Sequence, residues 1–134
     1  MITLIVGAKG AGKTKKMIDM INESAKTSHG NIVCIEKNMK LTYDIDHAVR
    51  LIDLDEFGVG DYEVLYGFVA GLLAGNYDIQ EIYLDGVLKV SDGDLEGLGA
   101  FLDKLDAITK QDVKAVVTVS ADADVLPAAV KKYL

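Results

Sequence analysis

Short, continuous apolar runs alternate with longer segments of helical periodicity along this chain. Runs rich in β-branched residues predict buried strands at 2–6, 31–36, 48–54, 81–85 and 113–119. Apolar positions spaced three and four residues apart predict helices at 13–25, 61–75, 95–108 and 125–133. Such alternation indicates an α/β fold, and we expect a three-layer α/β/α sandwich with a mainly parallel sheet of about five strands.

Two segments fit the pattern less well. The helix expected at 61–75 contains Gly67 and Gly71, each of which weakens a helix by about 1 kcal/mol. Close packing of this helix against the sheet would explain both glycines. Residues 37–46 are polar and irregular, and they predict no regular element.

Length and composition describe an ordinary globular protein. The 134 residues, half of them hydrophobic, suit one domain spanning residues 1–134. The apolar run Ile2 to Val6 is too short for a signal-peptide core or a membrane span, so we expect a cytoplasmic protein without membrane contact. Cys34, the sole cysteine, lies in an apolar strand and is interpreted as a buried structural thiol.

Charge is distributed unevenly along the chain. The net charge is −7, but residues 1–40 carry seven lysines and three acidic residues, whereas residues 41–134 carry seven basic and eighteen acidic residues. The acidic majority would repel a phosphate backbone, which argues against a broad nucleic-acid surface and leaves room only for a small local patch. The positive first third instead suits a compact anionic ligand.

A glycine-rich motif in that positive region provides the strongest chemical signal. It matches G-x-x-x-x-G-K-[ST] and consists of Gly7, Ala8, Lys9, Gly10, Ala11, Gly12, Lys13 and Thr14. Glycines let successive backbone amides turn towards phosphate oxygens, and the helix that follows adds the positive end of its dipole. In this motif Lys13 would reach the β- and γ-phosphates, and the Thr14 hydroxyl would coordinate magnesium.

Asp85 ends the strand expected at 81–85. The carboxyl ends of parallel strands meet at one edge of a sheet, where the glycine-rich loop is also expected, so Asp85 becomes the second candidate magnesium ligand. The alternative is structural, because Asp85-Gly86 is also a common turn dipeptide.

Together, Ile2 to Thr14 and Ile82 to Asp85 resemble the Walker A and Walker B motifs of P-loop NTPases. The length and layout are also similar to small stand-alone bacterial ATPase-like proteins of unassigned role. The resemblance implies a P-loop NTPase fold with ATP and magnesium bound at the loop. If it holds, the strand at 113–119 inserts between the first strand and the Asp85 strand, so that Ser120 faces the site. The alternative is that Ser120, Asp122 or Asp124 caps the final helix.

The residue that would activate water is less evident. Many hydrolytic members of the family carry a glutamate directly after the Walker B aspartate, but Gly86 stands there. In RecA-like ATPases, a glutamate on a neighbouring strand takes this role. Glu36 ends the second strand and resembles that glutamate in position. A solvated glutamate at the sheet edge is the alternative interpretation.

The arginine content separates the function classes. Arg50 is the only arginine, whereas small-molecule kinases use several arginines on a closing lid to clamp the transferred group. A small-molecule kinase is therefore the third hypothesis, after an ATPase and a nucleotide-dependent binding module. Arg50 could act as an arginine finger in a neighbouring subunit of a homo-oligomer, but a solvent-facing strand residue is the favoured interpretation. Without an N-K-x-D motif, adenine is the default base.

These observations predict an ATP-binding protein that acts as a slow magnesium-dependent ATPase. In this hypothesis Lys13 and Glu36 are the catalytic residues, and Thr14 and Asp85 hold the metal. The alternative is a binding module that changes shape with nucleotide for a protein partner, without useful hydrolysis. Both hypotheses predict that ATP binds at the glycine-rich loop.

Overall fold

The chain forms a five-stranded parallel sheet. The computed structural model describes residues 1–37, 44–110 and 112–134. Its strands are β1 (Ile2–Gly7), β2 (Asn31–Glu36), β3 (Arg50–Asp53), β4 (Ile79–Asp85) and β5 (Lys114–Ser120). Their spatial order is β1-β5-β4-β2-β3, and every pair is parallel. The expected insertion of the last strand between the first strand and the Asp85 strand is therefore confirmed.

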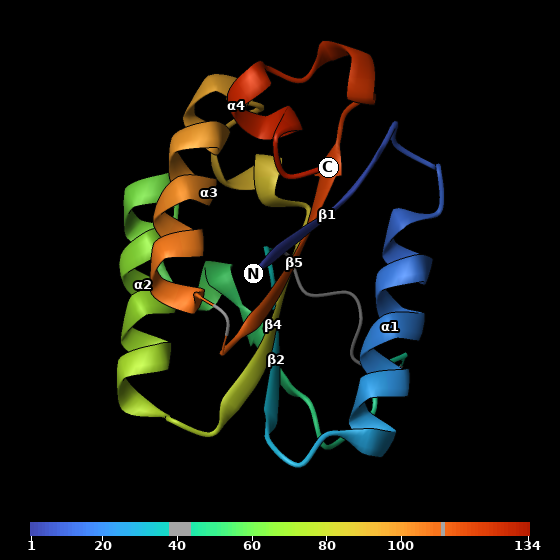
Figure 1. The fold of residues 1–134 in the computed structure, drawn as a ribbon, viewed down its shortest axis with the longest axis vertical. Helices are drawn as coiled ribbons and strands as arrows, with labels where there is room; N and C mark the ends of the chain where they lie inside the picture. The colour runs from blue at the N-terminus through green and yellow to red at the C-terminus, as the bar shows by residue number, and fades with distance from the viewer. Residues whose placement is uncertain (38–43, 111) are drawn as a thin grey trace.

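Helices cover both faces of this sheet (Figure 1). The first helix, α1 (Lys13–Thr27), lies on one face, while α2 (Tyr62–Gly75), α3 (Leu95–Thr109) and the short α4 (Ala128–Lys131) lie on the other. Three 3₁₀ turns complete the described elements: η1 (Leu54–Phe57), η2 (Val87–Val90) and η3 (Ala123–Val125). The α/β class and the parallel sheet follow the sequence prediction.

Each central strand is buried on both faces, which explains the continuous apolar runs. In β2, Ile32 and Cys34 pack with Met17 and Ile21 of α1. The intervening residues Val33 and Ile35 belong to the core beneath α2 and α3. Because side chains alternate along a strand, Glu36 shares the α1 face with Ile32 and Cys34.

The predicted helix at 125–133 is wrong in its extent. The structure has the 3₁₀ turn η3, then an extended Leu126, and α4 starts only after Pro127. A proline disfavours helical geometry in the residue before it, and Leu126 accordingly has φ −72° and ψ 136°. The helix therefore could not run through residue 126.

The packing explanation for the glycines of α2 is also wrong. A Cβ built on Gly67 or Gly71 would meet no atom within 4 Å outside the local helix backbone, and both residues are exposed. They lie on the solvent side of α2. The irregular stretch expected at 37–46 falls mainly on residues 38–43, which lie outside the described residues.

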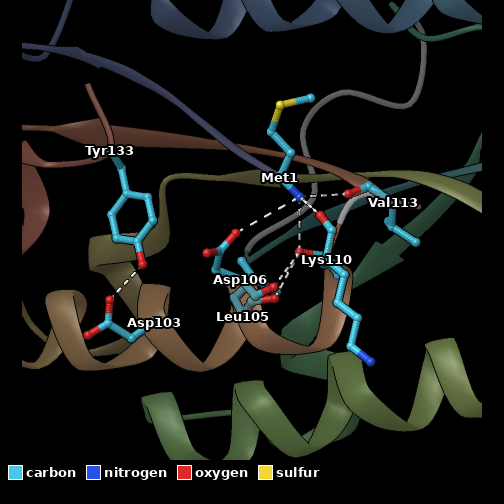
Figure 2. Close-up of polar contacts among 8 residues, drawn as sticks. Met1, Asp103, Leu105, Asp106, Lys110, Val113 and Tyr133 are labelled. Carbon is cyan, nitrogen blue, oxygen red and sulfur yellow. Dashed lines mark hydrogen bonds and ion pairs between the residues drawn. The ribbon is translucent and has the colours of Figure 1, made fainter.

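Polar contacts join the start of β1 to the end of α3 (Figure 2). The Met1 amino nitrogen donates to the carbonyl oxygens of Lys110 and Val113, and it lies 4.0 Å from a carboxylate oxygen of Asp106. Carbonyl groups at the carboxyl end of a helix favour a cation. Nearby, the Tyr133 hydroxyl donates a 2.6 Å hydrogen bond to Asp103, which connects the C-terminal segment to α3.

Across the described part of the chain, none of the helices has the length and apolar character needed to cross a bilayer.

Candidate functional site

The glycine-rich loop connects the carboxyl end of β1 to the start of α1. Gly12, the residue before α1, has φ +85°, a left-handed conformation that glycine adopts without strain. No side chain caps this helix start, and its first turn contains no acidic residue. By contrast, Asp61 caps α2 and Asp94 caps α3 through their carboxylates. The amino end of α1 is therefore the most electropositive of these three helix starts.

Lys13 begins α1 and lies along the loop. Its side chain is largely buried, with a relative exposure of 9%. Its ammonium nitrogen donates a 3.0 Å hydrogen bond to the carbonyl oxygen of Ala8. The loop thus holds a positive charge next to its own backbone.

A cavity of about 520 Å³ opens beside the loop, at the carboxyl ends of β4 and β5. Its volume falls in the usual range for sites that bind small molecules. The residues that line it are Lys9, Gly10, Gly12, Lys13, Thr14, Lys15, Asp85, Gly86, Leu88, Lys89, Thr118 and Ser120. Four of these residues are lysines and one is a carboxylate, so the cavity is cationic and suits a ligand with several negative charges.

Asp85 lies between two hydroxyl groups at the wall of this cavity. The Thr118 hydroxyl of β5 donates a 2.6 Å hydrogen bond to Asp85 Oδ1 and accepts a 2.7 Å bond from the Gly86 amide. The Thr14 hydroxyl lies 3.5 Å from Oδ1 and 3.4 Å from Oδ2 of Asp85. A carboxylate and a hydroxyl this close together are hard oxygen donors, the kind that Mg²⁺ prefers.

Glu36 lies next to Asp85 but not in the cavity wall. The two residues are register partners on β2 and β4, so their side chains leave the sheet on the same face. Glu36 is 3% exposed, which is inconsistent with the alternative of a solvated glutamate at the sheet edge. It is absent from the residues that line the cavity in the described part of the chain.

The two carboxylates also affect the pKa of the Cys34 thiol, which is buried on the same face of the sheet. Burial, together with smaller contributions from the charges of Asp85 and then Glu36, raises the pKa of its thiol to about 12. The thiol therefore stays protonated at neutral pH, in agreement with the structural role expected for it.

The structure brings together most of the predicted loop residues with Asp85. Gly7, Ala8 and Ala11 belong to the same loop but do not line the cavity among the described residues. Ser120 lines the cavity. Neither η3 nor α4 has a side-chain hydrogen bond at its start, so no contact supports the capping alternative. Arg50 is exposed on β3, at the opposite edge of the sheet from β1.

Sequence reasoning missed Lys89 and the contact made by Thr118. Lys89 lies in η2, four residues after Asp85, and its side chain passes close to Gly86. Only its position after the candidate metal ligand could have signalled it. Thr118 falls within the strand expected at 113–119, but its bond to Asp85 depends on the register of β4 and β5, in which Leu84 pairs with Val117.

No protein-family model matches this chain, and no curated protein matches it either.

Proposed function

We propose that the protein binds ATP with magnesium in this cavity, as a member of the P-loop NTPase fold class, and hydrolyses it slowly. The observation that carries the proposal is that Lys13 and Thr14 meet Asp85, which lies 71 residues after Thr14 in the sequence, at one cationic cavity. A turn that binds nothing has no need for such convergence.

Electrostatics support a triphosphate as the ligand. The amino end of α1 and the ammonium group of Lys13 both favour phosphate oxygens. Lys9 and Lys89 line the same cavity and add to the positive potential, whereas Asp19 partly offsets the charge of Lys15. A nucleoside triphosphate carries enough negative charge to satisfy them together.

The oxygen donors fit magnesium. Thr14 and Asp85 would hold the ion, with water and phosphate oxygens as its remaining ligands, because Mg²⁺ retains several waters and takes one or two carboxylates in nucleotide sites. When bound, the ion would neutralise charge on the β- and γ-phosphates. The hydrogen bond from Thr118 orients the Asp85 carboxylate for this role.

Slow hydrolysis follows from the groups around the cavity. Gly86 offers no side chain to activate water, and Arg50 lies on the far strand β3. An arginine finger accelerates comparable reactions by roughly 10³ to 10⁵ where one operates. Glu36 is close to Asp85 in register but outside the cavity wall, which also favours the second candidate function, a nucleotide-dependent binding module without useful turnover.

Calorimetric titration of the purified protein with MgATP tests binding. We expect saturable binding by the wild type and its loss in Lys13→Met, which keeps the aliphatic stem but removes the charge. Lys16→Met is the matched control, because Lys16 is exposed, follows closely in the same helix and does not line the cavity. Equal binding by the wild type and Lys13→Met would overturn the proposal.

A phosphate-release assay on the same preparations separates the two candidate functions. Release above background that disappears in Lys13→Met supports the slow ATPase. Tight MgATP binding without such release supports the binding module.

A further inference from the structure

Lys89 is held in place by a short, well-anchored turn. It lies in η2 between Val87 and Val90, which are 2% and 3% exposed and belong to the core. Its backbone amide donates a 3.0 Å hydrogen bond to the Gly86 carbonyl oxygen. The backbone at Lys89 is therefore fixed relative to the end of β4, although its side chain is exposed.

The side chain of Lys89 occupies the space beside Gly86. A Cβ built on Gly86 would lie 3.2 Å from Cε, 3.3 Å from Cδ and 3.5 Å from Nζ of Lys89. Gly86 also has φ +65°, so a side chain there would be strained as well as crowded. The lysine stem thus fills the position that a side chain after Asp85 would take.

Lys89 belongs to the cavity wall and is not paired with an acidic neighbour among the described residues. Lys89 lines the cavity together with Asp85 and Thr14. Within residues 1–37, 44–110 and 112–134, no carboxylate lies within 4.0 Å of its Nζ. Lys15, another lysine in the cavity wall, is instead paired with Asp19 at 3.1 Å.

From this geometry we infer that Lys89 binds the terminal phosphate of the nucleotide and makes the site prefer a triphosphate over a diphosphate. The inference rests on the proposed function. Lys13 and the loop belong to the β1 side of the cavity, whereas Lys89 comes from the end of β4, with β5 between them. Because magnesium held by Thr14 and Asp85 would bridge the β- and γ-phosphates, the last phosphate would lie near Asp85. Lys89 is the lysine of the cavity wall that follows Asp85 in the chain.

This arrangement gives the cavity a cation where a hydrolytic family member would carry a glutamate. A positive charge there stabilises the bound γ-phosphate but accepts no proton from water. The site is consequently better suited to retaining ATP than to cleaving it quickly. Discrimination between ATP and ADP is the property that a nucleotide-dependent binding module requires.

Calorimetric titration with MgATP and with MgADP tests the inference. In Lys89→Gln we expect ATP affinity to fall by about ten- to a hundredfold, the usual loss for a hydrogen bond to a charged group, and ADP affinity by less than about twofold. Lys89→Arg keeps the charge and should retain most of the preference for ATP. Lys16→Gln removes the same charge outside the cavity wall and should change both affinities equally.

The outcomes separate this inference from the proposed function. Saturable ATP binding by the wild type with an unchanged ATP-to-ADP affinity ratio in Lys89→Gln would overturn the role of Lys89 and leave the nucleotide site intact. No binding of either nucleotide by the wild type would overturn the proposed function itself. Circular dichroism of each variant checks folding, which substitution of an exposed side chain should preserve.

Discussion

Thr118 links its own strand to the carboxyl end of the neighbouring strand by bonding to Asp85. Its hydroxyl donates to Asp85 Oδ1 at 2.6 Å and accepts from the Gly86 amide at 2.7 Å. Thr118 is 1% exposed, so water cannot replace these bonds. One buried hydroxyl therefore orients the candidate metal ligand and also accepts a hydrogen bond from the Gly86 amide in the turn that follows it.

Thr118→Val keeps the shape of the side chain and removes both hydrogen bonds. The Gly86 amide and one Asp85 oxygen would lose a buried partner, which should lower the free energy of unfolding by about 1 to 3 kcal/mol. Urea denaturation of the wild type and variant measures this difference. Because the carboxylate also loses its orientation, a higher magnesium concentration should be needed for half-maximal nucleotide binding.

Thr118→Ser is the matched control for this prediction, since serine keeps the hydroxyl and loses only a methyl group. Its magnesium requirement should stay close to that of the wild type. A shift of the same size in the serine and valine variants would assign the effect to packing instead of the hydrogen bond.

Glu36→Gln tests whether a glutamate behind the cavity wall takes part in hydrolysis. The substitution keeps the size of the side chain and removes its ability to take a proton from water. If Glu36 is the base, phosphate release should fall by about 10²-fold or more while MgATP affinity changes little. Unchanged release would remove Glu36 from the mechanism, and its burial beside Asp85 would then be structural.

The sequence predicted the sheet and much of the cavity wall because both depend on local patterns. Buried parallel strands are continuous apolar runs, and their carboxyl ends necessarily share one edge of the sheet. The meeting of Lys13, Thr14 and Asp85 at the cavity follows from those two facts. The ligand that they bind stays a prediction.

The features that were missed depend on tertiary contacts. The bond between Thr118 and Asp85 depends on the register of β4 and β5, in which Leu84 pairs with Val117. The path of Lys89 depends on the left-handed turn at Gly86. The last helix is shorter than its apolar periodicity predicts, because Pro127 sterically disfavours helical geometry at Leu126. The position of Glu36 at a strand end specifies its neighbour in the sheet but not its access to the cavity.

Two glycine-to-alanine substitutions should change stability in opposite directions. Gly71→Ala adds a methyl group to an exposed helix position with no atom within 4 Å outside the local backbone, so unfolding free energy should rise by up to about 1 kcal/mol. In Gly99→Ala the new Cβ would lie 2.7 Å from the Ala129 Cβ, which forces α4 away from α3. We expect a loss of about 1 to 3 kcal/mol there.

Thermal and urea denaturation of the two variants, compared with the wild type, measure the contrast. Both substitutions raise helix propensity equally. Stabilisation by Gly99→Ala would therefore mean that α4 packs less closely on α3 than the structure indicates.

Cys34 should make the protein less stable at alkaline pH. Its thiol has a pKa of about 12 in the folded chain, compared with about 8.5 for an exposed cysteine. A raised pKa means that folding favours the protonated thiol. The resulting stabilisation is complete below about pH 8.5 and declines as pH rises towards 12, because only the unfolded chain then releases its proton.

Urea denaturation at pH 7 and pH 10, for the wild type and Cys34→Ala, isolates this effect. The alanine variant should be less stable at pH 7 because it leaves a small cavity. Its deficit should shrink at pH 10 by on the order of 1 to 2 kcal/mol, since only the wild type has a thiol to ionise on unfolding. A deficit that is equal at both pH values would show that Asp85, Glu36 and the surrounding core do not raise the pKa of this thiol.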